Sequence, residues 1–375
     1  MQKLISFCKK DIVLTAAWVL AIVSAFFVPP QVGYLEYIDF RSLGLLWSLM
    51  VIMKIFQKDG VFSAIGMKLI ERTHTMRQLV IVLVLLCFFF SMLITNDVAL
   101  ITFVPFAIMM LSRCGRSDMM IPVIVLQTIA ANLGSMMTPI GNPQNLYLCG
   151  LSGLGFAGLG KLVFPYTFLA LILLIACIFC LRGGSDRVEA ESEEGSSSIR
   201  HKRVVAVYAI AFVAAMLVVV RIFPYWVLVL AIALVSLLLR QDSVFKVDYA
   251  LLLTFIGFFI FTGNMQKIPA VSDLLDRLVT GNEIAAGVLT SQVISNVPSA
   301  LLISSFTHNI KGLILGVNIG GLGTLIASMA SLISYKLYAA EAGSNKGKYM
   351  VEFSAINAAL LAALLLECFL LRTFL

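Results

Sequence analysis

Two short polar segments interrupt long apolar runs and carry side chains that could bind an ion. Residues 95–97 read Thr-Asn-Asp, and residues 295–297 read Ser-Asn-Val. Asn offers a carbonyl oxygen and an amide donor on a short stem, and Ser or Thr adds a hydroxyl. These groups can coordinate a small cation, while the N-terminal end of a helix favours an anion. The two segments therefore predict a binding site for small ions.

A second pair of polar segments lies in apolar runs that glycine and proline break. The stretch 132–140 matches 318–326, with Asn, Gly and Thr at corresponding positions, and residues 141–145 read Gly-Asn-Pro-Gln-Asn. For one isolated Asn, a helix–helix hydrogen bond is the simpler interpretation. The repetition beside breaks favours a site instead. The residues expected to bind cation or substrate are Thr95, Asn96, Asp97, Asn132, Gly134, Thr138, Asn142, Asn145, Ser295, Asn296, Asn318, Gly320 and Thr324.

The composition requires lipid as the solvent around these segments. Of 375 residues 60% are apolar and 13% are charged, and the mean hydropathy is +1.00. Runs of about 17 or more apolar residues recur, which is the length that an α-helix needs to cross a bilayer. The net charge of +7 comes from basic residues placed singly or in small groups between these runs, as membrane topology requires, so no nucleic-acid partner is expected.

Tracing the basic residues predicts an all-α polytopic membrane protein with a cytoplasmic N-terminus, about nine spans and two re-entrant hairpins. The first half, 1–181, contains a hairpin at 78–112 and a broken helix at 119–148. A cytoplasmic linker follows at 182–203. The second half, 204–375, contains a hairpin at 285–306 and a broken helix at 313–337. Its final span leaves the C-terminus outside.

The two halves are expected to be inverted repeats. Residues 38–40 (Ile-Asp-Phe) correspond to 247–249 (Val-Asp-Tyr), and Gln-Lys at 57–58 corresponds to Gln-Lys at 266–267 without a gap. The charge pattern sends the two corresponding spans in opposite directions. Inverted repeats place broken helices near the bilayer midplane, where their ends form a site.

Asp97 is the main difference between the halves, because Val297 takes its place in the second. A carboxylate at membrane depth costs several kcal/mol unless it is paired, protonated or bound to a cation. Asp97 therefore either couples transport to a proton or cation, or caps the helix that follows. Paired catalytic carboxylates, His-rich metal spacings and phosphate-binding loops are not evident, so no enzyme, no organic cofactor and no metal beyond Na⁺ is expected.

These motifs resemble the ion-transporter superfamily of citrate–metal symporters, divalent-anion/sodium symporters and arsenite permeases, nearest to its citrate-transporter and arsenite-permease-like branch. The resemblance implies a dimerising scaffold, a transport domain and elevator-like alternating access. It also implies one cation site at Thr95, Asn96 and the break near Gly134, and another at Ser295, Asn296 and the break near Gly320. The dicarboxylate branch has Ser-Asn-Thr at both hairpin tips. This chain has Asp and Val at the third positions, which weakens dicarboxylate recognition.

The sequence thus predicts a secondary, ion-coupled transporter of a small anion across the inner membrane, with Na⁺ or H⁺ as coupling ion and a homodimer by family analogy. An arsenite- or antimonite-type efflux permease is the first alternative, and a cation/proton antiporter is the second. A channel is an alternative of another class, because broken helices also serve pores.

Overall fold

A computed structural model describes residues 12–70, 73–181, 186 and 199–374, and this part of the chain is helical without a β-strand. The expected N-terminal segment before residue 12 and most of the linker lie outside the described residues. The helices of the first half are α2 (Ile12–Phe27), α3 (Phe40–Lys58), α4 (Val61–Ile70), α5 (Met76–Phe90), α6 (Asn96–Arg113), α7 (Met120–Ser135), α8 (Pro143–Ser152) and α9 (Phe156–Cys180). Those of the second half are α10 (Lys202–Val219), α11 (Tyr225–Leu238), α12 (Tyr249–Gln266), α13 (Pro269–Val279), α14 (Glu283–Ile294), α15 (Asn296–Ser304), α16 (Ile310–Ile319), α17 (Met329–Ala339) and α18 (Lys346–Phe374).

Seven helical segments in the described part are long and apolar enough to cross a membrane. They are Phe40–Lys58, Asn96–Arg113, Ser117–Ser135, Phe156–Cys180, Lys202–Val219, Tyr249–Gln266 and Lys346–Leu371. Several further apolar helices are shorter, among them α2 with 16 residues and α11 with 14. The expectation of an all-helical polytopic membrane protein is confirmed at this level.

The interruptions fall where the polar segments predict them. The first polar segment lies at the junction of α5 and α6, which residues 91–95 separate, and only Ser295 separates α14 from α15. Residues 136–142 separate α7 from α8, and residues 320–328 separate α16 from α17. Ser295 has φ 76° and ψ 154°, a backbone conformation that is costly for a residue with a Cβ.

Two corresponding aspartates start corresponding helices in the same way. The Asp39 carboxylate accepts hydrogen bonds from the backbone N–H groups of Arg41 and Ser42 at the start of α3. The Asp248 carboxylate accepts one from Leu251 at the start of α12. The backbone angles agree closely, with φ −78° and ψ 84° at Asp39 and φ −77° and ψ 83° at Asp248. A carboxylate at this position satisfies amides that a helix start leaves free.

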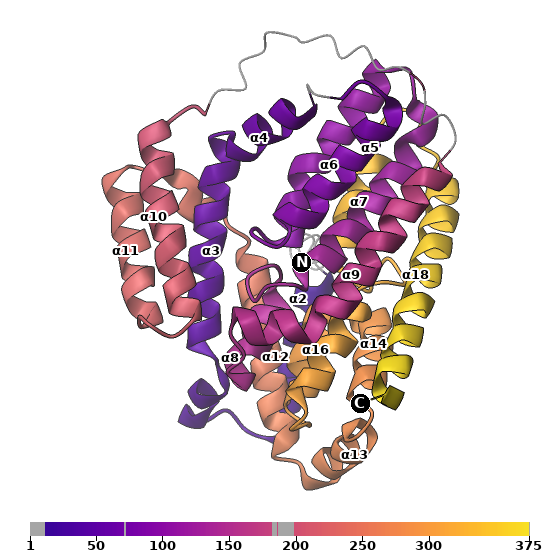
Figure 1. Cartoon of the computed structure of the whole chain (residues 1–375). Helices are drawn as coiled ribbons and strands as arrows, with labels where there is room; N and C mark the ends of the chain where they lie inside the picture. The colour runs from indigo at the N-terminus through magenta and orange to yellow at the C-terminus, as the bar shows by residue number, and fades with distance from the viewer. Residues whose placement is uncertain (1–11, 71–72, 182–185, 187–198, 375) are drawn as a thin grey trace.

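The helices form two groups that can be followed in Figure 1. In one group α3 packs against α10 and α11. In the other, α5, α6, α9 and α18 pack around α7, which is buried along nearly its whole length. The pairs α2–α12 and α14–α16 also pack closely. The short helices α4 and α13 lie at opposite ends of the molecule (Figure 1).

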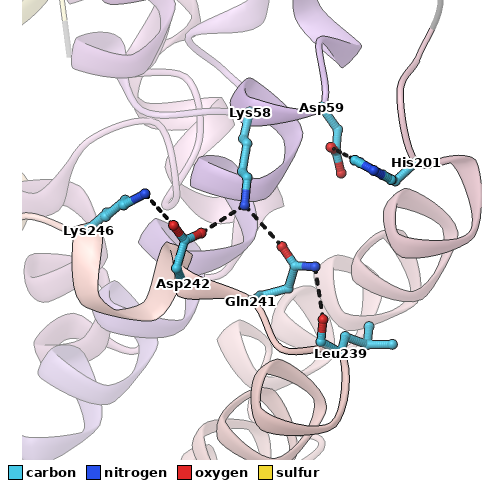
Figure 2. Close-up of polar contacts among 7 residues, drawn as sticks. All are labelled: Lys58, Asp59, His201, Leu239, Gln241, Asp242 and Lys246. Atoms are coloured by element: carbon cyan, nitrogen blue, oxygen red, sulfur yellow. Dashed lines mark hydrogen bonds and ion pairs between the residues drawn. The ribbon is translucent and has the colours of Figure 1, made fainter.

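A cluster of charges holds the end of α3 against the second half, as Figure 2 shows. The Asp242 carboxylate pairs with Lys246 and, at 2.8 Å, with Lys58. Hydrogen bonds from Lys246 and Lys58 lower the pKa of the Asp242 carboxyl to about 2. Nearby, His201 Nδ1 lies 2.8 Å from the buried carboxylate of Asp59. These contacts tie α3 to the segments that begin α10 and α12.

Candidate functional site

The backbone of each polar tip is fixed by the break of the neighbouring helix pair. Asn96 N–H donates to the Gly141 carbonyl at 3.0 Å, and Asn296 N–H donates to the Ala327 carbonyl at 2.9 Å. Asn96 and Asn296 are the first residues of α6 and α15. The two tips therefore contact the two breaks in equivalent ways.

The side chain of Asn132 joins the first tip to the second break. Its Oδ1 accepts from Asn96 Nδ2 at 3.1 Å and from the Ser328 hydroxyl at 2.9 Å. Its Nδ2 lies 3.5 Å from the Gly321 carbonyl, at the outer limit of a hydrogen bond. Asn132, near the end of α7, thus bonds across to the break between α16 and α17.

Asn318 makes the reverse connection. Its Nδ2 donates to Asn145 Oδ1 at 2.7 Å, and its Oδ1 accepts from Asn142 Nδ2 at 3.1 Å. Asn145 Nδ2 in turn donates to the carbonyls of Met136 and Thr138. Each half therefore supplies an Asn whose side chain bonds to residues of the other half, and these side chains are almost completely buried.

Three of the predicted residues line a small cavity between the tips. Its volume is about 10 Å³, enough for the centre of one water-sized species. Its wall consists of Asn96, Asp97, Pro143, Gln144, Leu251, Asn296, Val297, Ser328 and Met329. The buried Gln144 Oε1 has no hydrogen-bond partner among the described residues. Unpaired carbonyl oxygens of this kind can bind a small cation.

A larger cavity of about 220 Å³ adjoins the same tip. Thr95, Asp97, Val98 and Ile101 form one wall, and Lys54, Gln57 and other residues of α3 form another. Lys246 and Asp248 complete its charged lining. The Asp97 carboxylate has no hydrogen-bond or ionic partner among the described residues, and the Asp97 backbone N–H donates to Asn96 Oδ1 at 3.0 Å. The carboxylate is therefore available to a ligand in either cavity.

The remaining predicted residues hold the site together rather than face a cavity. The Thr138 hydroxyl donates to the Met92 carbonyl, and the Thr324 hydroxyl donates to the Gln292 carbonyl at 3.1 Å. A Cβ on Gly134 would lie 2.1 Å from the Phe88 carbonyl oxygen, so this glycine permits close packing of α7 on α5. Gly320 similarly fits against Val288. The Ser295 hydroxyl points to the Ala327 carbonyl at 3.5 Å.

Sequence reasoning missed several residues that line or brace the site. Gln144 lies within the 141–145 stretch of turn formers and amides, which could have indicated it. Ser328 and Gln292 gave no comparable signal, although Gln292 Nε2 donates to the carbonyls of Gly320 and Leu322. In the sequence, Lys54 is only one of the basic residues that indicate the cytoplasmic side of the membrane. In the structure it lines the larger cavity. No group of three or more His, Cys, Asp or Glu suited to a metal ion occurs in the described part of the chain.

The helical fold is that of a polytopic membrane protein, and comparison with known proteins gives its family and shows that it is a transporter. The family model described as "Citrate transporter" matches residues 3–311, and the chain belongs to this family. This confirms the resemblance drawn from the motifs and the expectation of a transporter rather than an enzyme.

Named relatives agree with this assignment. The inner membrane protein YbiR of Escherichia coli is 33% identical over 322 residues, which cover 84% of each chain. An uncharacterized transporter of Methanocaldococcus jannaschii is 30% identical and covers 80% of this chain and 81% of its own. A silicon efflux transporter of Oryza sativa is 28% identical over 144 residues, which are 38% of this chain and 29% of the relative.

The close packing at Gly134 gives a first prediction. Gly134→Ala places a methyl group against a backbone carbonyl that cannot move freely. We therefore expect the free energy of unfolding to fall by about 1–3 kcal/mol and the unfolding temperature in detergent to be lower. Gly155→Ala is the matched control, because its Cβ would meet nothing within 4 Å. Equal unfolding temperatures for the two variants would contradict the packing role.

The hydrogen bonds of Asn318 to the first half give a second prediction. Asn318→Ala leaves Asn145 Oδ1 without its donor and removes the acceptor for Asn142 Nδ2. We therefore expect the free energy of unfolding to fall by about 1–3 kcal/mol. Asn357→Ala serves as control, since the Asn357 amide donates only to the Phe353 carbonyl of its own helix. Thermal unfolding followed by tryptophan fluorescence compares the two. An Asn318 variant as stable as the Asn357 variant would mean that the hydrogen bonds of Asn318 contribute little.

Proposed function

We propose that this protein is a secondary active, ion-coupled transporter that moves a small anion across the inner membrane by elevator-like alternating access. The observation that carries the proposal is the reciprocal bonding of Asn132 and Asn318, which brings two tips and two breaks to one place. Family membership supports transport, and the Escherichia coli relative is named as an inner membrane protein.

The proposal takes the two halves as inverted repeats and the pairs α5–α6 and α14–α15 as re-entrant hairpins. The matching caps of α3 and α12 and the equivalent tip-to-break hydrogen bonds support this reading. The N-terminus is then cytoplasmic, and the larger cavity, near Lys54 and Lys246, opens toward the cytoplasm. By family analogy, the scaffold helices form a homodimer.

In this mechanism the coupling ion binds between the tips. Na⁺ would take oxygens of Thr95, Asn96 and the break near Gly134 at one position, and of Ser295, Asn296 and the break near Gly320 at the other. Asp97 can accept either a proton or the charge of a cation. The anion would lie beside it, where Lys54 and Lys246 attract negative charge into the larger cavity.

An arsenite- or antimonite-type efflux permease is the second candidate. Asp97 and Asp248 both line the larger cavity, and their charge favours an uncharged hydroxylated solute over a multiply charged anion. The relative named as a silicon efflux transporter, although matched over a limited part of both chains, also supports efflux of such a solute.

A ligand screen by thermal shift tests the site. Purified protein in detergent is heated with citrate, other small anions, arsenite or silicic acid, with Na⁺ and pH varied. We expect one class to raise the unfolding temperature, and we expect Asn96→Ala and Asn296→Ala to remove that shift because both amides line the small cavity. Asn357→Ala should retain it. Ligand shifts that survive both tip substitutions would refute the site assignment.

A further inference from the structure

The larger cavity contains four charged side chains, and only two of them are already committed to other groups. Lys246 pairs with Asp242, and the Asp248 carboxylate accepts from the Leu251 N–H at 3.1 Å. Lys54 and Asp97 have no ionic partner among the described residues. The Lys54 ammonium lies 3.4 Å from Gln57 Oε1, a long and weak contact.

Lys54 and Asp97 both line this cavity and come from different helices. Lys54 comes from α3, and Asp97 comes from the first turn of α6. The lining from α8 and α17 is uncharged, consisting of Pro143, Met329 and Ile333. Among the described residues that line the cavity, Asp248 and Lys246 are the only other charged side chains. Lys54 is therefore the one cation among these lining residues that has no ionic partner.

The second half lacks both charges at the corresponding positions. Lys54 lies 15 residues after Asp39, and Gly263 lies 15 residues after Asp248. Val297 corresponds to Asp97. A Cβ on Gly263 would lie 2.4 Å from the ring of Tyr37, so the ring fills the space that a side chain would need. A lysine and an aspartate are thus present together in one half and absent together in the other.

A lone charge on either wall would oppose closure of the cavity. Enclosing an unpaired carboxylate in a low-dielectric site costs several kcal/mol, and an opposite charge within contact distance offsets much of that cost. A transporter that changes between its two access states without a bound coupling ion must compensate the charge of the Asp97 carboxylate in another way.

We propose that Lys54 is the internal counter-charge of Asp97, pairing with it when the cavity closes without a cation and released when a cation or proton binds there. Lys54 and the coupling ion then compete for one carboxylate. This inference rests on the proposed function, because it requires Asp97 to bind the coupling ion. Lys54 acts as a positioning residue through Asp97 and does not itself contact the transported ion.

The competition is measured by titrating the full-length protein in detergent with Na⁺ at neutral pH, and with protons in Na⁺-free buffer, while the unfolding temperature is followed. Lys54→Gln removes the competitor, so we expect the half-saturating concentration of the effective cation to fall on the order of tenfold. Lys54→Arg keeps the charge and should stay near wild type. Asp97→Asn should abolish the response.

Lys58→Gln is the matched control. Lys58 belongs to the same helix but pairs with the exposed Asp242 and does not line the cavity. The half-saturating cation concentration of the Lys58→Gln variant should remain at the wild-type value. If Lys54→Gln also leaves the midpoint unchanged while Asp97→Asn abolishes the response, the counter-charge role is wrong and the proposed function stands. If Asp97→Asn responds like wild type to both cations, coupling at Asp97 fails and the inference fails with it.

A double variant decides the question should Lys54→Gln not fold. The inference predicts that Lys54→Gln/Asp97→Asn restores folded protein in size-exclusion chromatography, because removing both charges leaves no uncompensated carboxylate. A double variant that folds no better than Lys54→Gln would overturn the inference.

Discussion

The structure depends on satisfying backbone polar groups where helices break inside a hydrophobic molecule. In lipid no water is available to bind a free amide or carbonyl, so each break needs partners from the protein. Here those partners are amide side chains. Asn145 Nδ2 donates to the carbonyls of Met136 and Thr138 in the first break, and Gln292 Nε2 donates to the carbonyls of Gly320 and Leu322 in the second. The side chains of Asn132 and Asn318 then link the two halves, Asn132 through Ser328 and Asn318 through Asn142 and Asn145.

The two parts of this site share one backbone contact between tip and break but carry different charges. Asn96 and Asn296 make equivalent backbone contacts, whereas only the first tip carries a carboxylate. The Asn96 side chain is bonded to Asn132, and Gln144 Oε1 beside the same cavity has no hydrogen-bond partner among the described residues. Two positions with different side chains can bind different species, which the proposed ion-coupled transport requires.

Much of the fold could be predicted from sequence because the signals were chemically distinctive. Apolar runs indicated helices, and Asn, Gly and Pro within them indicated breaks close to those observed. The pairing of Asn318 with Asn142 could not be predicted, since it joins residues 176 positions apart and depends on how the two halves pack. For the same reason, Thr138 was expected at the binding site but braces a loop, and Lys54 was read as a topology signal although it lines a cavity.

The proposed transport depends on a coupling ion bound between the two tips and a solute bound beside it. The most direct test is initial-rate uptake into proteoliposomes of whichever solute stabilises the purified protein, measured against solute concentration and against an imposed Na⁺ or proton gradient. We expect saturable uptake, dependence on one of the two gradients and a fixed ratio of coupling ion to solute. Uptake that rises linearly with solute concentration and does not depend on either gradient would indicate a pore and contradict ion-coupled transport.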